Sequence, residues 1–487
     1  MRILYLDCDT LRADHLGCYG YERDTSPNLD RVAAEGVRFT QCWASDVPCL
    51  PSRASLYNGR FGIHTGIVNH GGLAADLRLE GRDRGFKTHG YSQTWMSRLR
   101  QAGFHTVSVS PFAERHSAWW FYAGFNEMYN FGKSGQEIAD EIEPLALDWI
   151  QRRGKEDNWF MQVNFWDPHT AYRTPADFGN PFEDAPPPAW MTEERIREHY
   201  AGYGPHSAQD TWGNAAASDE QLKRYPRVPR NIASLADFKR WIDGYDVGIR
   251  YMDDRIGRLL NALDEQGVLD ETAVILSTDH GENQGELNIY GDHHTADRPT
   301  CNIPLIMRWP GMQAGLVDDA LHYNTDMAAT VVDLAGGTVP DRWDGVSFGD
   351  TFRTGEAAGR ESVVVSQCAW ACQRSVRFGP WLLMRTYDDG LKDFRPIMLF
   401  NLEDDPYETN DLADAKPEVV SEGLAILERW TTDMMQGSDS DIDPLWTVVR
   451  EGGPYHTRDN LESYCAHLRA TGRADHADAL EARHARR

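Results

Sequence analysis

The sequence of 487 residues has no long uninterrupted apolar run. A membrane-spanning helix needs about 18 or more consecutive apolar residues, and no such stretch is present. The N-terminus, MRILYLDCDT, passes from the first Met into a short apolar run that ends in carboxylates, and it has neither the apolar region nor the cleavage site of a secretory signal. We therefore expect a soluble, cytoplasmic protein with no signal peptide and no membrane segment.

Positive charge is also scarce. Lys and Arg number 49 against 75 Asp and Glu, which gives a formal net charge of -26. This charge repels nucleic acids and anionic membrane surfaces over most of the molecule, so neither is an expected partner. An anionic small-molecule substrate remains compatible, because a metal ion and a few arginines can reverse the potential inside one cleft.

Cysteines are few and scattered, without the paired spacing of a structural zinc site or a disulfide framework. We expect seven of the eight to be reduced, buried thiols, and Cys49 to differ for the reasons given below. The eight are Cys8, Cys18, Cys42, Cys49, Cys301, Cys368, Cys372 and Cys465.

Apolar, β-rich runs alternate with amphipathic helical patterns over about 350 residues, which predicts an α/β fold with a large, mostly parallel mixed sheet flanked by helices. We expect residues 1–360 to form this α/β domain. The expected strands are Ile3–Leu6, His105–Val109, Trp159–Phe165, Ala273–Ser277 and Ile303–Arg308. The expected helices are Pro27–Gly36, Glu137–Arg152 and Leu235–Glu265.

A smaller α+β domain is predicted for residues 361–487. Its expected strands are Ser362–Ser366, Trp381–Arg385 and Pro396–Leu402, and a helix is expected at Glu418–Met434. The charged, Ala-rich tail over residues 459–487 is predicted to be helical, as an oligomerisation arm or as a frayed end. Residues 174–230, rich in Pro, acidic residues and Trp, form an expected loop insertion with either a functional or a purely solvated role.

Polar clusters follow several of the expected strands. These clusters are Asp7–Thr10, Asp167–His169, Asp279–Glu282 and Asp292–His294. In an open α/β sheet, ligands bind at the carboxyl ends of the strands. Carboxylates and imidazoles that meet there suit a divalent cation, so the sequence predicts a metal site.

A further candidate is the segment Cys49–Arg53, which opens an expected helix. A proline close to a helix start is favourable, and free backbone N–H groups at the helix N-terminus attract anions. An unmodified Cys49 thiolate, activated by the helix dipole and Arg53, is one candidate nucleophile.

The segment Cys49-x-Pro51-Ser52-Arg53 resembles the C-x-P-x-R maturation signature of type I sulfatases, in the alkaline phosphatase superfamily, whose cysteine is converted to formylglycine. Further segments resemble that family's landmarks in the same order along most of the chain. They are Asp9–Gly17, Thr25–Leu29, Asp279–Glu282, Pro304–Gly311 and Phe400–Pro406.

The resemblance implies an alkaline-phosphatase-like fold and a formylglycine-dependent sulfuric ester hydrolase that needs a maturation enzyme as a partner. Asp9, Asp279 and His280 are the implied ligands of one divalent cation, with an oxygen of residue 49. Ca²⁺ is preferred, with Mn²⁺ or Mg²⁺ as alternatives. Asp7 is not assigned as a ligand.

The resemblance also implies roles for residues around the sulfate. Arg53 would steady the hydrated formylglycine and offset the sulfate charge. His169 matches the histidine next to the leaving group, where it can donate a proton. His70 follows closely enough after the Cys49 helix to reach the substrate, or it caps a loop.

Two lysines that family members carry are absent. Ser110–Ala113 stands where the first is usual, and Tyr290–Thr295 where the second is usual. His293 or His294 is expected to substitute, with His294 preferred as the catalytic group and His293 as a substrate-binding group. Phosphonate monoester hydrolases of the same superfamily tolerate changes at these positions, so the ester is left open.

The favoured substrate is a sulfated carbohydrate, because exposed aromatic rings can stack on sugar faces, although such rings can equally pack an interface. The rings in question are Trp119, Trp120, Trp190 and Trp212. The alternatives are a phosphonate monoester or phosphodiester hydrolase, and a catalytically silent glycan-binding protein. The chain can also form a homo-oligomer.

Overall fold

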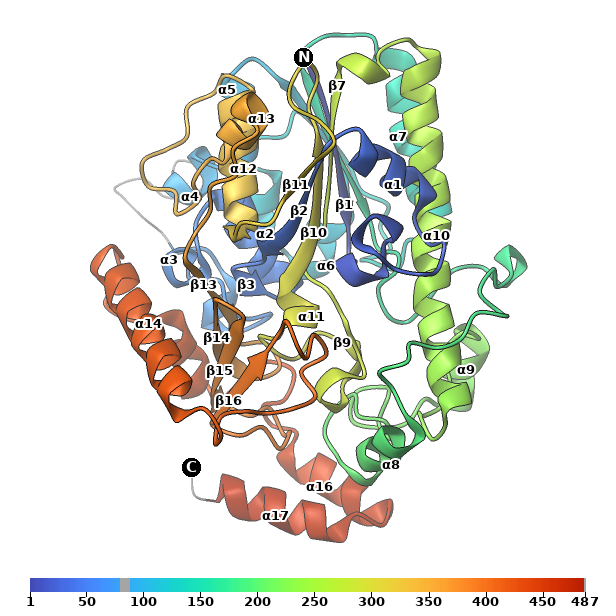
Figure 1. The fold of residues 1–487 in the computed structure, drawn as a ribbon, viewed down its shortest axis with the longest axis vertical. Helices are drawn as coiled ribbons and strands as arrows, with labels where there is room; N and C mark the ends of the chain where they lie inside the picture. The colour runs from blue at the N-terminus through green and yellow to red at the C-terminus, as the bar shows by residue number, and fades with distance from the viewer. Residues whose placement is uncertain (79–87, 486–487) are drawn as a thin grey trace.

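A nine-stranded sheet runs through the centre of the computed structural model, which describes residues 1–78 and 88–485, except for the side chain of His89 (Figure 1). Its strand order is β11-β2-β10-β7-β1-β6-β4-β5, with β12 beside β2. The strands are β1 (Arg2–Cys8), β2 (Val37–Trp43), β4 (His105–Val109), β5 (Glu127–Tyr129), β6 (Trp159–Phe165), β7 (Thr272–Ser277), β10 (Asn302–Arg308), β11 (Leu316–Asp318) and β12 (His322–Tyr323).

Helices cover both faces of this sheet, because successive side chains of a strand point to opposite faces. In β1, Ile3 and Tyr5 enter one apolar core, whereas Leu4 and Leu6 enter the other. On the first face lie α2 (Cys49–Asn58), α5 (Trp95–Gln101) and α12 (Asn324–Leu334), and on the second lie α1 (Pro27–Ala34), α7 (Ala139–Arg153) and α10 (Leu235–Glu265). The predicted α/β architecture is confirmed.

The direction of the strands decides where the site forms. Among the described strands of this sheet, β10 is antiparallel to both its neighbours, and all the others run the same way. The carboxyl ends of β1, β4, β6 and β7 therefore meet at one edge. The loops that follow these strands carry most of the polar residues discussed below.

A second sheet of five strands, in the order β16-β15-β14-β13-β3, lies beside the first. Its strands are β3 (Asp46–Val47), β13 (Ser362–Gln367), β14 (Cys372–Phe378), β15 (Trp381–Asp388) and β16 (Ile397–Asn401). Strand β3, just before Cys49, pairs in parallel with β13. Helices α14 (Pro417–Gln436) and α15 (Pro444–Arg450) pack on this sheet.

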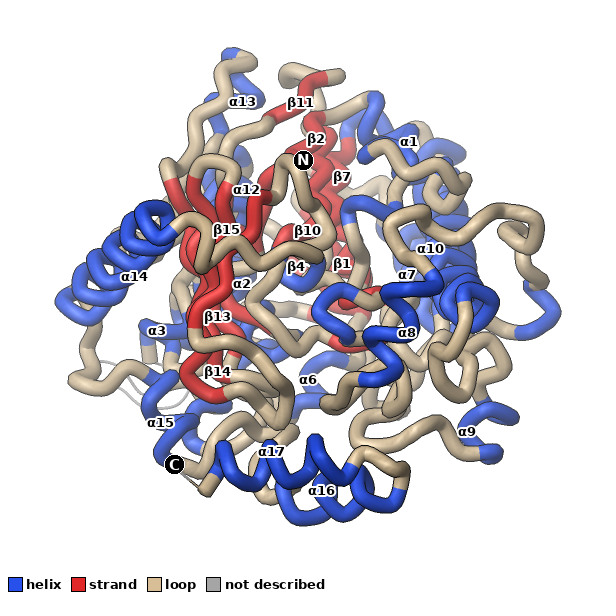
Figure 2. Tube along the Cα trace, turned by 60° about the horizontal axis from the view of Figure 1, so that its bottom comes forward, coloured by secondary structure: helices blue, strands red, loops and turns tan. Residues whose placement is uncertain are grey.

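The segment at residues 174–230 is an excursion with two short helices, α8 (Glu193–Ala201) and α9 (Asp219–Arg224). The C-terminal helices α16 (Leu461–Ala470) and α17 (Ala474–His484) pack against it, as Figure 2 shows at the bottom of the molecule. Arg473 joins the two by a bidentate ion pair with Asp210, with N–O distances of 2.9 Å. The tail is therefore a docked helical hairpin up to residue 485.

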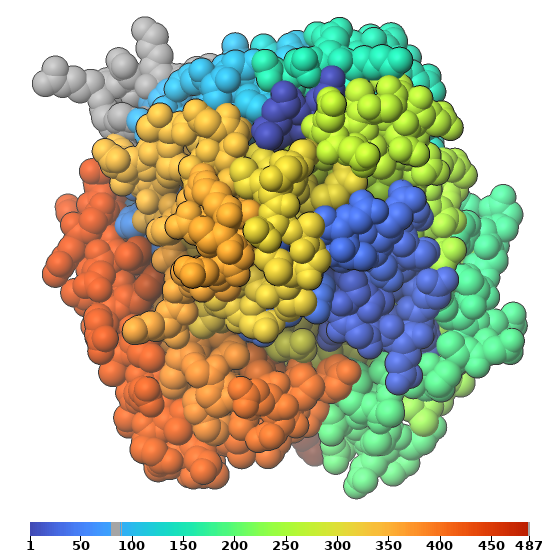
Figure 3. Space-filling model, turned by 45° about the horizontal axis from the view of Figure 1, so that its top comes forward, coloured from blue at the N-terminus to red at the C-terminus, as the bar shows by residue number. Residues whose placement is uncertain are grey.

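The remaining α-helices and strands of the described residues are short. They are α3 (Gly62–Thr65), α4 (His89–Ser92), α6 (Phe112–His116), α11 (Arg298–Cys301), α13 (Gly349–Thr354), and a hairpin of β8 (Asn283–Gln284) and β9 (Tyr290–Asp292). In Figure 3 the blue N-terminal segment lies on the surface, bordered by yellow and yellow-green segments from much later in the chain. Over the described residues, no helix is long and apolar enough to cross a membrane.

Candidate active site and metal centre

Four side chains from three separate parts of the chain meet at the carboxyl edge of the central sheet. Asp9 follows β1, Asp279 and His280 follow β7, and Cys49 is the first residue of α2. Their ligand atoms all lie within 4.8 Å of one another, and all four residues are buried. The four residues that the sequence analysis expected to be neighbours therefore lie together in the structure.

Arg53, one helical turn after Cys49, is the positive charge of this group. Its Nη2 lies 3.1 Å from a carboxylate oxygen of Asp7 and 3.1 Å from one of Asp9, and its Nη1 donates to Asp279. Since Asp7 also accepts from Nε of Arg53 at 3.2 Å and from Gln162 at 2.8 Å, it is fully engaged in holding the arginine.

The chemistry of the donors fits a divalent cation. Both carboxylate oxygens of Asp9 are buried without a hydrogen-bond donor, although one lies near Arg53. Burial and the neighbouring Asp279 raise the pKa of Asp9 well above its ordinary value. A cation between the two carboxylates would relieve that repulsion.

His280 is oriented as a metal ligand. Its Nδ1 donates to the carbonyl oxygen of Gly281 at 2.7 Å, so in the neutral ring Nε2 carries the free lone pair. Nε2 lies 3.1 Å from Sγ of Cys49. Burial lowers the pKa of His280, which keeps the ring neutral.

Cys49 begins α2 as the sequence predicts, and only 1% of it is exposed. Burial, followed by Asp9 and Asp279, raises the pKa of its thiol well above the ordinary value, whereas Arg53 acts in the opposite direction. Burial and these two carboxylates thus disfavour a Cys49 thiolate more than Arg53 favours it.

His169 and His293 lie next to this group. The His169 ring is 5.7 Å from that of His293, which in turn is 4.3 Å from the ring of His280. His293 also has a ring nitrogen within 4.8 Å of the ligand atoms of Cys49 and His280. Nε2 of His169 is buried without a partner, so it is available to a bound molecule.

His294 lies in a different group from His293. It joins His206 and Asp292, with ligand atoms within 4.8 Å of one another, and its ring stacks on Trp370 at 4.0 Å. The geometry thus favours His293 over His294 for the position beside Cys49. His206 comes from the insertion, which therefore contributes to the surroundings of the site.

His70 is held in a separate histidine contact. Its Nδ1 lies 2.9 Å from Nε2 of His456, and its ring is 5.0 Å from that of His116. The amide of His70 is capped by Asn69, and its Nε2 has no partner. His116 and His456 were not expected from the sequence, because they come from a short helix and from the C-terminal tail.

Two expectations require correction. Asp167 accepts a hydrogen bond from the amide of Ala139 at 2.9 Å, at the start of α7, so this member of the polar clusters does not face the metal group. Trp120 is 2% exposed and packs among core aromatic rings, which excludes it as a sugar-stacking surface.

The other three tryptophans differ in their surroundings. Trp190 stacks on Tyr407 at 4.7 Å and Trp212 on Tyr225 at 5.5 Å, so each packs between protein segments. Trp119 alone of these four is largely exposed, at 67%.

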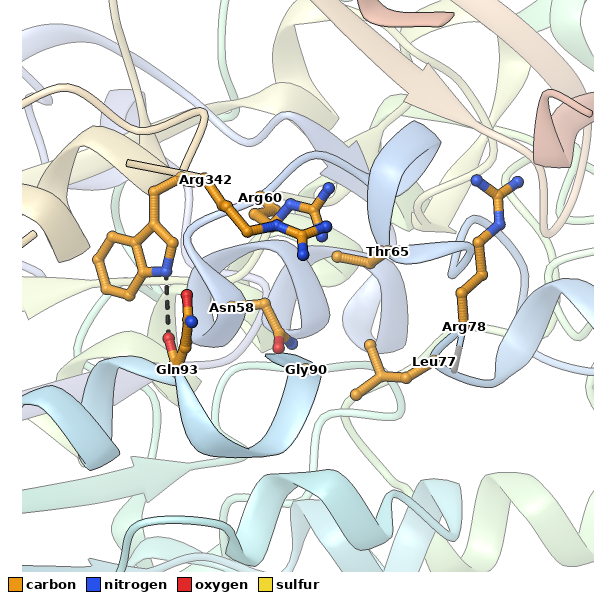
Figure 4. A pocket seen from close by; sticks show the side chains of 9 residues that line it. Asn58, Arg60, Thr65, Leu77, Arg78, Gly90, Gln93 and Arg342 are labelled. Carbon is orange, nitrogen blue, oxygen red and sulfur yellow. Dashed lines mark hydrogen bonds between the residues drawn. The ribbon is translucent and has the colours of Figure 1, made fainter. Parts of the chain in front are cut away.

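Figure 4 shows a different pocket, to which Asn58, Arg60 and Trp343 contribute. Asn58 is the last residue of α2, whereas Cys49 is the first. A helix of this length separates them by about 14 Å, at 1.5 Å per residue. This pocket is therefore distinct from the Cys49 group.

The central mixed sheet carries a buried group of two carboxylates, an imidazole and a cysteine at the start of a helix, and its fold matches that of a solved phosphonate monoester hydrolase and a solved 2-O glycosaminoglycan sulfatase. The sulfatase family model matches residues 2–337, and a model for the C-terminal part of N-sulphoglucosamine sulphohydrolase matches residues 285–425. The chain belongs to the sulfatase family and is a sulfuric ester hydrolase.

Individual relatives are distant but cover most of the chain. An N-acetylglucosamine-6-O-sulfatase of Bacteroides thetaiotaomicron is 24% identical, over 92% of this chain and 89% of the relative. A protein solved with its substrate D-glucosamine-2-N,6-O-disulfate aligns with a TM-score of 0.71 and 21% identity, over 90% of this chain and 99% of the other. A phosphonate monoester hydrolase from Silicibacter pomeroyi aligns with a TM-score of 0.68 and 19% identity, over 92% and 97%.

Proposed function

We propose that the protein hydrolyses a sulfate ester of a carbohydrate, with formylglycine at position 49 and one bound divalent cation, Ca²⁺ in preference to Mn²⁺ or Mg²⁺. The observation that carries this proposal is the meeting of Asp9, Cys49, Asp279 and His280 within one ligand shell. The carbohydrate assignment is supported by the relatives that act on sulfated glucosamine.

Formylglycine, once hydrated, would supply one hydroxyl that attacks sulfur and a second that later collapses to release sulfate. The cation would be held by Asp9, Asp279 and His280, and it would polarise the sulfate oxygens. Arg53 keeps both carboxylates in place and adds positive charge at the point of attack.

His169 is the proposed proton donor to the leaving oxygen. It lies beside the metal group, its Nδ1 is held by the carbonyl oxygen of Thr170, and its Nε2 is unpartnered. In the neutral ring Nε2 carries a lone pair, so this role needs the ring to be protonated at Nε2, a form that the negative charge of a bound sulfate ester would favour. A proton donated from Nε2 would then lower the barrier to releasing an alkoxide. His293, adjacent to His280, is the proposed contact to the sulfate, while His294 and His70 are proposed to contact the rest of the substrate.

The test is turnover of matched esters by protein produced together with a formylglycine-generating enzyme. We expect conversion of Cys49, detected by mass spectrometry of the peptide that contains it, and Ca²⁺-dependent release of sulfate from glucosamine 6-sulfate. Phenyl phosphonate esters should be poorer substrates than phenyl sulfate. Preference for the phosphonate would favour the alternative of a phosphonate monoester hydrolase, and absence of both conversion and turnover would refute the enzymatic mechanism.

A further inference from the structure

Two half-buried arginines, Arg115 and Arg173, lie outside any ion pair of the described residues. The Nε atoms of both are buried without a hydrogen-bond partner. Arg115 donates a hydrogen bond from Nη1 to the carbonyl oxygen of Ser134 at 3.4 Å, and within the described residues neither arginine is ion-paired. By contrast, the buried Arg53 and Arg374 are both ion-paired with carboxylates. A guanidinium that is partly withdrawn from water and has no carboxylate within ion-pair distance keeps N–H donors that a bound anion can use.

Arg115 lies close to the metal group. Its guanidinium carbon is 4.8 Å from the ring centre of Trp166, and that of Arg53 is 6.0 Å from the same ring. The Trp166 ring also meets His169 edge-on at 5.7 Å. Arg115 is thus one aromatic ring away from Arg53 and from the proposed proton donor.

Arg173 stands four residues after His169, in the loop that follows β6. Burial, and then the positive charges of Arg115 and Arg173, lower the pKa of His169. Burial lowers the pKa of Arg173, the carboxylate of Asp167 raises it, and the positive charge of Arg115 lowers it again. Arg173 shares a loop with His169, and Arg115 lies one aromatic ring from it, so two cations outside any ion pair of the described residues lie near the same ring in a chain whose net charge is -26.

We propose that Arg115 and Arg173 form an oxyanion-binding pair that holds a sulfate or carboxylate group of the substrate. Guanidinium groups present planar sets of N–H donors that match such oxyanions, and an anion between two cations removes their repulsion. This inference builds on the proposed hydrolysis of a sulfated carbohydrate. The oxyanion is either the scissile sulfate or a second acidic substituent of the same sugar.

The competing explanation is structural, in which Arg115 serves only to pack on Trp166 by a cation–π contact. The two explanations differ in ligand affinity. Binding is measured by calorimetry in excess CaCl2, on the full chain with Cys49→Ala so that no turnover occurs. The probes are inorganic sulfate, glucosamine 6-sulfate and glucosamine 2-N,6-O-disulfate.

We expect Arg115→Gln and Arg173→Gln each to raise the Kd at least tenfold, and Arg115→Lys to restore part of the loss. The matched control is Arg38→Gln, because Arg38 is also half-buried over an aromatic ring, 5.1 Å from that of Tyr19, but lies on β2. The control should leave every Kd within about twofold of the parent. That change is well below the tenfold rise in Kd expected when a charge-assisted contact is lost.

The pattern over the probes identifies the bound group. An equal loss for both sugars and inorganic sulfate identifies the scissile sulfate, whereas a loss confined to the disulfate identifies a second acidic substituent. Unchanged Kd values in both glutamine variants, or no binding of any probe to the parent, would overturn the proposal. Failure of the proposed function is seen separately, as absence of turnover by the converted wild-type protein while the arginine-dependent binding persists.

Discussion

Replacing Arg53 with Ala tests how the buried charges of the metal group are balanced. Arg53 is fully buried and contacts the carboxylates of Asp7, Asp9 and Asp279, so its loss leaves three buried carboxylates without their cation. Breaking a buried ion pair by removing one partner lowers the free energy of unfolding by about 3–5 kcal/mol. We expect a loss of that size when the protein is unfolded in EDTA.

The loss should be smaller in CaCl2, because Ca²⁺ would compensate Asp9 and Asp279 and leave Asp7 as the uncompensated group. Asp7 keeps its hydrogen bond from Gln162 at 2.8 Å. The expected loss is then about 1.5–3 kcal/mol, the range for one unsatisfied charged group.

The measurement is urea unfolding followed by tryptophan fluorescence and circular dichroism under both conditions. The control is Arg374→Ala, since Arg374 is equally buried and pairs with Asp443 at 2.6 and 2.8 Å, in the C-terminal sheet. Its loss should be about 3–5 kcal/mol with and without Ca²⁺. If Arg53→Ala loses the same free energy in EDTA and CaCl2, the carboxylates do not share a cation and the reasoning is wrong.

Three further predictions concern single side chains. Cys49→Ala should abolish sulfate release while lowering the free energy of unfolding by only about 1 kcal/mol; normal turnover would refute its assignment as nucleophile. His169→Gln should reduce kcat for alkyl sulfates by about 100-fold and for activated aryl sulfates much less, and equal losses would exclude proton donation. Burial raises the pKa of Asp253 to about 6, so between about pH 4 and that value the folded state binds more protons than the unfolded chain and stability falls as pH rises. Asp253→Asn should flatten this fall in urea midpoints, and an unchanged slope would contradict the assignment.

Local pattern was sufficient to predict the elements whose apolar residues follow a clear period. Strands β4 and β6 and helix α10 have the bounds expected from the sequence. Strand β14 was missed because it contains Gln373, Arg374 and Arg377, yet all its residues are buried. Gln373 and Arg374 are accommodated in the interior through partners distant in sequence, Ala296 for Gln373 and Asp443 for Arg374, which periodicity does not reveal.

The same distinction applies to the site. The polar clusters after β1 and β7 could be predicted to meet because both follow strands at the same edge. The choice of Asp9, Asp279 and His280 with Cys49 came from the resemblance to type I sulfatases. Arg115 was not predicted, because the segment that resembles the family ends at Ala113, one half-turn earlier on the same short helix. His456 could not be predicted, because its contact with His70 joins residues 386 positions apart.

The position of Cys49 sets the timing of any chemical conversion of this residue. Strand β3 ends two residues before Cys49 and pairs with β13. The last residue of β13, Gln367, is synthesised about 320 residues after Cys49. At roughly 5–20 residues per second, the ribosome leaves about 16–64 s between the two events. Because the finished fold exposes only 1% of Cys49, the proposed maturation enzyme would have to act on the nascent or still unfolded chain, and its rate relative to translation would set the fraction of converted molecules.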